Sequence, residues 1–296
     1  MIIGLPRFGI YSNIAKSFIE GLGHKVIMPT KVTRSMIQLG ASHSSDMICF
    51  PYKVALGQQI WALENGATDL IMWNNCGICR QKHYPELEEI TLKELGYKFN
   101  IHIITKKTIR KMLKQLGGIS IFQAIKRLKG IYKQVKEIEE KAYAFSNDNR
   151  TLKIGLVGEV YTMWEHDINF DIVKKLQGKG VNVDVSITLS DFLTHNVIKG
   201  KEEEKEAKKL LSQDLGGHGF ESIVNTIWYG KNNYDGIIHL LPLSCMPEST
   251  VEVLIDQMAT KYDIPLYRFP IDESNFEAGF NTRLETFVGM LKRRKK

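Results

Sequence analysis

Short apolar runs alternate with amphipathic segments along the whole chain, in two successive sets. The runs that predict strands in the first set are Met1–Leu5, Lys25–Met28, Asp69–Trp73 and Phe99–Ile104. Those in the second set are Leu152–Val157, Val181–Ile187, Gly236–Leu241 and Pro265–Phe269. Strands that are separated by helices need crossover connections, and such connections favour parallel pairing. The pattern therefore predicts an α/β protein with two doubly wound parallel sheets and a helical connection between them.

The segments between these runs have apolar residues at helical spacing. In the first set they are Ser12–Leu22, Val32–Leu39, Pro51–Glu64 and Glu86–Leu95, and in the second Phe170–Leu176, Glu202–Leu211, a segment after Gly219, Thr250–Lys261 and Ala278–Lys292. A basic helical region, Lys107–Tyr143, and the polar cluster Ser146–Arg150 separate the two sets. Polar clusters of this kind are typical of linkers. We expect one domain over residues 1–145, with the basic extension, and a second over residues 151–296.

Composition agrees with two ordinary globular domains. The chain has 296 residues, of which 43% are hydrophobic and 25% charged, which excludes a disordered tail, a collagen-like fibre and a disulfide-dense mini-domain. The apolar runs are far shorter than the roughly 20 residues that a membrane span requires. The first residues lack the pattern of a signal peptide. We therefore expect a cytoplasmic protein that has no membrane partner.

Basic residues exceed acidic ones by 40 to 33, which gives a net charge of +7. Part of the surplus lies in Lys106–Lys136 and in Lys292–Lys296. A surplus of this size suits an acidic ligand or an acidic protein partner. No helix-turn-helix, zinc-finger or RNA-binding signature surrounds these charges, so the sequence does not predict a nucleic-acid partner.

The four cysteines fall where a parallel α/β fold places ligands. Cys76 and Cys79 follow the strand Asp69–Trp73, and Cys245 follows the strand Gly236–Leu241; ligands of such folds bind beyond the carboxyl ends of the strands. Cys49 precedes a helix that proline can start, and the amides of a helix start favour the thiolate. In a reducing cytosol, metal binding or thiol chemistry is expected rather than structural disulfides.

Several interpretations of these cysteines remain open from spacing alone. Cys49 and Cys245, each taken alone, could be small apolar fillers of a core. The Cys76-Gly-Ile-Cys79 loop has a familiar ligand geometry, for which a zinc site and a redox disulfide compete. Four thiolates suit either zinc or an iron–sulfur cube. His83 could replace Cys79 as a ligand.

Six segments of the chain resemble one known family, in the same order and over nearly the whole length. They are Asp46–Gly57, Val157–Tyr161, Asn169–Asp171, Gly216–Ser222, Leu243–Glu248 and Asp272–Phe287. The most specific are Cys-Met-Pro-Glu within Leu243–Glu248 and the Glu-Ala-Gly and Thr-Arg-Leu-Glu motifs within Asp272–Phe287. Together they resemble the acyl-CoA dehydratase activase-related group, the relatives of 2-hydroxyacyl-CoA dehydratase subunits and of double-cubane cluster proteins.

This resemblance implies an oxygen-sensitive iron–sulfur protein of anaerobic metabolism, built from flavodoxin-like domains. Family members receive low-potential electrons, in several cases from an ATP-hydrolysing activase, and use them for a difficult reduction. Cys49 and Cys245 match cysteines of the family best, and Cys76 matches a cysteine that follows the equivalent strand. With Cys79 as the fourth thiolate, the resemblance implies a [4Fe–4S] cluster; with three cysteines, one iron would keep an open position for a substrate.

A double-cubane cluster would need more thiolates than the four cysteines of one chain. Either one cube binds, or a homodimer contributes further ligands. The chain has no Walker phosphate-binding loop and no dinucleotide fingerprint. We therefore expect ATP hydrolysis to belong to a partner, such as an ATP-dependent activase or another electron donor.

Three polar residues are candidates for catalysis: Glu159, His218 and Glu248. His218 lies between Gly217 and Gly219, and glycines allow a backbone to approach a ligand or cluster sulfide closely; the alternative is an exposed histidine at a helix start. Glu159 could contact a substrate or cap a loop. Glu248 could protonate a substrate, but an ion pair with Arg283 is favoured.

The sequence thus predicts an iron–sulfur redox protein in which two domains clasp the cluster. The cluster would either reduce a small-molecule substrate or relay electrons to another enzyme. The alternative is a non-catalytic α/β binding or assembly module, with zinc or without metal, that docks through the basic helical region. A third hypothesis is a nucleotide- or CoA-binding protein that uses the same cleft without a metal.

Overall fold

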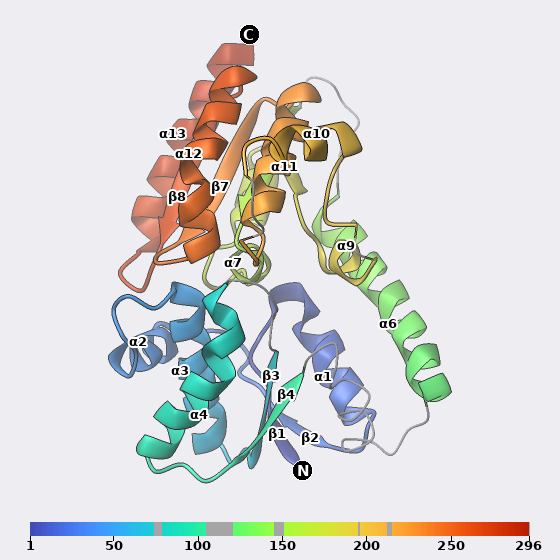
Figure 1. Ribbon diagram of the computed structural model, residues 1–296, viewed down its shortest axis with the longest axis vertical. Helices are drawn as coiled ribbons and strands as arrows, with labels where there is room; N and C mark the ends of the chain where they lie inside the picture. The colour runs from blue at the N-terminus through green and yellow to red at the C-terminus, as the bar shows by residue number, and fades with distance from the viewer. Residues whose placement is uncertain (74–78, 105–120, 145–150, 195, 212–214, 296) are drawn as a thin grey trace. The chain divides into compact units, whose positions relative to one another are not determined.

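The computed structural model describes residues 1–73, 79–104, 121–144, 151–194, 196–211 and 215–295. The chain divides into two compact units, Met1–Ile138 and Glu139–Lys296 (Figure 1). The division falls within the long helix α6 (Ile121–Ala142). The predicted linker Ser146–Arg150 lies outside the described residues.

The first unit contains a parallel sheet, as predicted. Its strands are β1 (Ile2–Gly4), β2 (Lys25–Ile27), β3 (Asp69–Trp73) and β4 (Asn100–Ile104). Within the described residues their order is β2-β1-β3-β4, and every neighbouring pair is parallel. This is the beginning of the flavodoxin-like strand order, in which the chain reverses direction across the sheet between β1 and β3.

Helices cover both faces of this first sheet. The helical elements before α6 are η1 (Gly9–Tyr11), α1 (Ser12–Glu20), α2 (Arg34–Ser42), α3 (Phe50–Glu64), η2 (Arg80–His83) and α4 (Tyr84–Glu94). Successive strand residues point to opposite faces. Ile3 and Ile71 accordingly pack against Ile19 of α1, whereas Leu70 packs against residues of α3 and α4.

The second unit repeats this topology. Its strands are β5 (Leu152–Gly158), β6 (Val181–Val185), β7 (Gly236–Pro242) and β8 (Leu266–Ile271). Their order among the described residues is β6-β5-β7-β8, again entirely parallel. Its helices are α7 (Val160–Trp164), α8 (Ile172–Gly178), α9 (Leu189–Thr194), α10 (Lys201–Ala207), α11 (Gly219–Lys231), α12 (Met246–Lys261) and α13 (Glu277–Lys295). The predicted α/β fold class is confirmed for both units.

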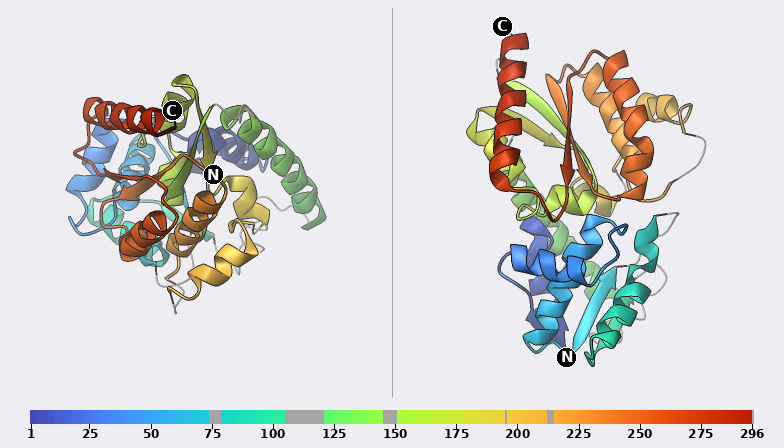
Figure 2. Two further views of the ribbon diagram at one scale, coloured as in Figure 1. Left: turned by 90° about the horizontal axis from the view of Figure 1, so that it is seen from above. Right: turned by 90° about the vertical axis from the view of Figure 1, so that its left-hand side faces the viewer.

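The helices of the second unit lie on opposite faces of its sheet. The ring of Tyr229, on α11, packs directly on Gly155 of β5, while Leu291 of α13 packs on Gly236 of β7. Gly236 is in register with Ile154, so Gly155 and Gly236 face opposite sides. Figure 2 shows α11 and α12 on one side of the sheet and α13 on the other.

Two differences from the predicted elements bear on the site. Helix α12 begins at Met246 rather than at Thr250, because Pro247 and Glu248 already belong to its first turn. Helix α7 was not predicted, since it has only five residues, which is too short for a helical period to be recognised. None of the helices within the described residues combines the length and the apolar character that a membrane span requires.

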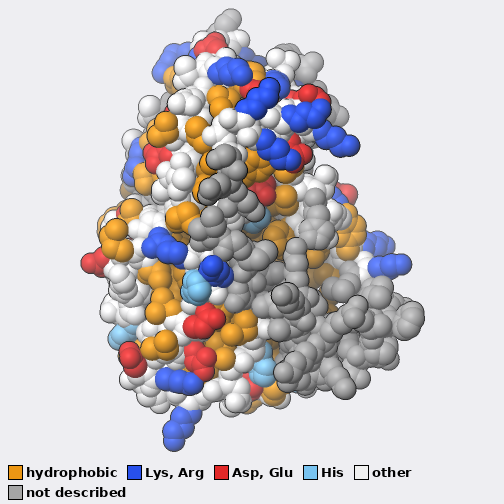
Figure 3. Space-filling view, viewed as in Figure 1, with side chains coloured by type: hydrophobic (Ala, Val, Ile, Leu, Met, Phe, Trp, Pro, Cys, Tyr) orange, Lys and Arg blue, Asp and Glu red, His pale blue; other side chains and the backbone are white. Residues whose placement is uncertain are grey.

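Many lysines of the second unit are paired with neighbouring acidic residues. Lys231 and Lys261 both contact Glu206, at 3.0 and 2.7 Å, and Lys205 contacts Glu202 at 2.8 Å. On the face shown in Figure 3, basic and acidic side chains are intermingled near α10. The charges of these three lysines are therefore neutralised locally.

Candidate functional site

Two of the four cysteines lie at the carboxyl edge of the first sheet. Cys49 is the residue before α3, and Cys79 is the residue before η2, shortly after β3. A helix that leads into a parallel strand starts at the carboxyl edge of the sheet, so α3 brings Cys49 to the edge where β3 ends. Cys76 lies outside the described residues, and none of Cys49, Cys79 and Cys245 forms a disulfide in the described part of the chain.

Side chains of η2 and α4 join the segments that carry Cys49 and Cys79. Arg80 donates from Nη1 to the carbonyl oxygen of Met47 at 2.9 Å. The hydroxyl of Tyr84 contacts the sulfur of Cys49. Burial raises the pKa of Tyr84 far above its ordinary value, and the neighbouring thiols of Cys49 and Cys79 raise it further. The sulfur of Cys49 thus lies against a buried phenol.

The sulfur of Cys49 has mixed surroundings. Cys49 is 8% exposed and belongs to an apolar cluster with Leu56, Ile60 and Leu70, as the filler interpretation predicts. The sulfur also contacts a hydroxyl group, although a cysteine that only fills space in an apolar core needs no polar partner. The rings of Tyr52 and Tyr84 meet edge to face, with centroids 4.8 Å apart. These rings hold the phenol against the sulfur.

A buried carboxyl group lies one turn further along α4. Glu88 is 1% exposed, and burial raises its pKa well above the ordinary value, against a smaller opposing effect of a hydrogen bond from Gln59. Folding raises the pKa of this carboxyl above its value of about 4.3 in the unfolded chain. Its contribution to stability is therefore fully present below about pH 4.3, and it is lost as the pH rises through the pKa of the folded state.

We therefore expect Glu88→Gln to increase the free energy of unfolding at pH 8 and to change it little at pH 4. An amide has the shape of the protonated carboxyl but does not ionise, so it avoids the burial of a charge. Urea unfolding of both proteins at the two pH values measures the effect. Glu94→Gln, at an exposed position of the same helix, is the control and should show no such pH dependence. Equal stability of the Glu88→Gln and native proteins at pH 8 would contradict the expectation.

The second unit carries Cys245 and His218 at the carboxyl edge of its own sheet. Cys245 precedes α12 and is 5% exposed, and His218 precedes α11. Gly217 has a φ of +65°, a left-handed conformation that favours glycine. A Cβ on Gly219 would come within 2.8 Å of the carbonyl oxygen of Pro247. The starts of α11 and α12 therefore touch, and only glycine permits this approach.

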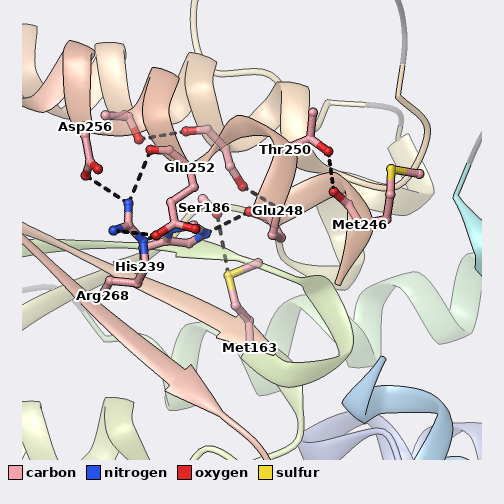
Figure 4. Close-up of polar contacts among 11 residues, drawn as sticks. Met163, Ser186, His239, Met246, Glu248, Thr250, Glu252, Asp256 and Arg268 are labelled. Carbon is pink, nitrogen blue, oxygen red and sulfur yellow. Dashed lines mark hydrogen bonds and ion pairs between the residues drawn. The ribbon is translucent and has the colours of Figure 1, made fainter. Parts of the chain in front are cut away.

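Glu248, in the first turn of α12, lies at the centre of a buried polar network (Figure 4). Its Oε1 accepts a hydrogen bond from Ser222 Oγ at 3.1 Å, and its Oε2 lies 2.9 Å from His239 Nε2. Arg268 Nε donates to His239 Nδ1 at 3.3 Å, so Nδ1 is the acceptor and Nε2 carries the proton that points to Glu248. Glu248 and His239 are 1% and 0% exposed.

The network reaches the surface through Arg268. This side chain also pairs with Asp256 at 2.9 Å and with Glu252 at 3.0 Å, both on α12. The predicted pairing of Glu248 with Arg283 is wrong. Arg283 lies on α13, on the opposite face of the sheet from α12, and its Nε donates to the carbonyl oxygen of Gly279 at 3.1 Å.

Glu159 caps the short helix α7. Its carboxylate accepts from the backbone amides of Tyr161 at 2.9 Å and Thr162 at 2.8 Å, and from the hydroxyl of Thr162 at 2.7 Å. Burial nevertheless raises the pKa of Glu159, and the charge of nearby Glu248 raises it further. This is the capping role that the sequence analysis gave as one alternative for Glu159. The carboxyl groups of Glu159 and Glu248 thus both lie near the carboxyl edge of the second sheet.

The ring of His218 is largely buried rather than exposed. Burial lowers its pKa, although the charge of Glu248 opposes the shift, so the neutral imidazole is favoured. Its Nδ1 lies 3.9 Å from Glu221 Oε2, which is beyond hydrogen-bond distance. The structure therefore brings His218, Glu159 and Glu248 into one electrostatic neighbourhood at the edge that carries Cys245.

Sequence reasoning missed Tyr84, His239 and Arg268. A histidine within the apolar strand Gly236–Pro242 was a usable signal, because a buried polar side chain in a strand requires a partner. Tyr84 gave no comparable signal, since aromatic residues are common at the start of core helices.

Another group of candidate ligands lies just after α7. Atoms of Glu165, His166 and Asp167 that could bind a metal lie within 4.8 Å of one another. These are three successive residues with oxygen and nitrogen donors, and the carboxylate of Glu165 already accepts from the amide of Asp167 at 3.2 Å. The group differs in chemistry from the thiol set and was not predicted.

A comparison with known protein families finds no family model that matches the chain, and a comparison with curated proteins finds no significant match. The resemblance to the acyl-CoA dehydratase activase-related group therefore stays a prediction.

Proposed function

We propose that the protein is an iron–sulfur redox protein, related to the 2-hydroxyacyl-CoA dehydratases. The observation that supports this most is the arrangement of Cys49 and Cys79. Their segments are joined at the carboxyl edge of the first sheet by the hydrogen bond from Arg80 to Met47 and by the contact of Tyr84 with Cys49. Two thiols at the ligand-binding edge of an α/β fold are suited to a soft metal centre.

The residues fit a thiolate-ligated cluster. Cys49 lies at the start of a helix of 15 residues, where backbone amides stabilise a thiolate, the form that binds metal. We propose Cys49, Cys76 and Cys79 as ligands from the first unit and Cys245 as the fourth. Cys245 occupies the same kind of position, before a helix of 16 residues. Its membership in one ligand set with the others remains a prediction from the sequence, because it belongs to the second unit.

A [4Fe–4S] cluster at this edge would supply one-electron reduction at low potential. The second unit carries groups suited to proton transfer at the carboxyl edge of its own sheet: Glu159 has a raised pKa, and His218 is favoured in the neutral form. Groups of this kind can exchange a proton with a small substrate near neutral pH. Gly217 would let a backbone amide approach a group bound at this second edge, whereas Gly219 is required by the contact with Pro247.

The proposed partner is a low-potential electron donor, such as an ATP-dependent activase, in the cytoplasm. The electrons would go either to a small-molecule substrate bound by this protein or to another enzyme. A homodimer would add thiolates if the centre is larger than one cube.

The experiment that tests this function compares iron and sulfide in cysteine variants purified without oxygen. We expect the iron bound per molecule of Cys49→Ser or of Cys76→Ser to be at least about tenfold lower than in the native protein, since each substitution removes a ligand. Cys245→Ser tests whether the second unit contributes. Ser44→Ala, in the loop before Cys49, is the control and should retain native iron. Native iron content in Cys49→Ser and Cys76→Ser alike, or stoichiometric zinc in all proteins, would overturn the proposal.

A further inference from the structure

The hydroxyl of Tyr84 is directed at the sulfur of Cys49 by the packing around it. Tyr84 is the first residue of α4 and is followed by Pro85, which starts the helix. The residue is 8% exposed, and its ring lies edge-on to the ring of Tyr52 at 4.8 Å. A buried side chain packed in this way has little freedom to turn, so its hydroxyl stays at the sulfur.

The direction of the contact follows from the chemistry of the two groups. A phenol hydroxyl is a good donor, whereas a thiol is a weak donor and a thiolate has no proton to give. A sulfur that is bound to a metal is deprotonated and can only accept. The Tyr84 hydroxyl is therefore the donor, and the bond is strongest when the sulfur carries charge.

We infer that Tyr84 is a positioning residue that donates a fixed hydrogen bond to the Cys49 sulfur and tunes the potential of the centre which this sulfur binds. The tuning rests on the proposed function, whereas the hydrogen bond does not. Hydrogen bonds to ligand sulfur stabilise the more negatively charged, reduced cluster and so raise its reduction potential. Arg80 holds the Met47 backbone close by and keeps the two cysteine segments in place.

The bond itself is tested in metal-free protein by a double-mutant cycle. Tyr84→Phe removes only the hydroxyl, and it should raise the unfolding equilibrium constant about tenfold when Cys49 is present. In a Cys49→Ala background the same change should have less than about a twofold effect. Tyr52→Phe is the matched control, because it removes a hydroxyl from the neighbouring ring, and its effect should be the same in both backgrounds. Equal effects of Tyr84→Phe in the two backgrounds would overturn the inference.

The tuning is tested by redox titration of the iron-loaded protein. At a fixed applied potential, Tyr84→Phe should raise the ratio of oxidised to reduced cluster about tenfold, which corresponds to a shift of about 59 mV to more negative potential for one electron. An unchanged ratio would overturn the tuning even if iron is bound. A protein that binds no iron would refute the proposed function, and the cycle in metal-free protein would then still decide whether the hydrogen bond exists.

Discussion

Gly57→Ala is expected to destabilise the first unit by about 3 kcal/mol or more, the upper range for overpacked cores. Helices α2 and α3 cross at two glycines. A Cβ on Gly57 would lie 1.9 Å from the carbonyl oxygen of Met36, and one on Gly40 would lie 1.8 Å from that of Lys53. The obstacles are backbone atoms, which cannot turn away as a side chain can. The helices must therefore separate, and α3 would carry Cys49 out of position at its start.

Urea unfolding followed by circular dichroism measures this effect. Gly130→Ala is the matched control, since it is the same substitution in a helix with nothing within 4 Å of the added carbon. That variant should gain up to about 1 kcal/mol, because alanine favours a helix more than glycine does. A Gly57→Ala protein within about 0.5 kcal/mol of the native stability, the usual range for surface substitutions, would show that the helices do not cross as described.

His239→Leu is expected to destabilise the second unit by about 3 kcal/mol, the lower end of the range for breaking a buried pair. The substitution removes the donor that lies 2.9 Å from Glu248 Oε2 and leaves this carboxylate buried with only Ser222 as a described side-chain donor. The cost thus arises from a charge that has lost its partner.

The double variant His239→Leu with Glu248→Leu tests this cause. Replacing both members of a buried pair by apolar residues is often close to neutral, so the double variant should be more stable than His239→Leu alone. Asp256→Ala is the control; it removes an exposed partner of Arg268 and should cost about 1 kcal/mol or less. A double variant less stable than either single one would contradict the assignment of the pair.

Strand positions could be predicted from the sequence because strands such as β1, β3, β5 and β7 are short, mostly apolar runs. Asp69–Trp73 was predicted with the boundaries that the structure has. Helix starts were harder, since a first turn such as Met246–Ser249 contains few apolar positions and its beginning depends on a proline and on tertiary contacts. Parallel pairing also followed from the alternation of strands and helices.

Site residues could be predicted only where the residue type itself indicates a chemical role. Cysteines and glycine-rich turns can be recognised directly in a sequence. The partner of Glu248 could not be predicted in this way, because it depends on which face of the sheet α12 covers. The sequence favoured Arg283, but the sheet separates α13 from α12, and His239 on β7 lies beside Glu248 instead. The contact of Tyr84 with Cys49 joins residues 35 positions apart, which no local pattern reveals.

Electron paramagnetic resonance of the native protein, purified without oxygen and reduced with dithionite, tests the central claim most directly. The account predicts a brown protein with equal amounts of iron and sulfide and the signal of a reduced [4Fe–4S] cluster. A colourless protein with stoichiometric zinc, or one without metal and without a signal, would contradict it.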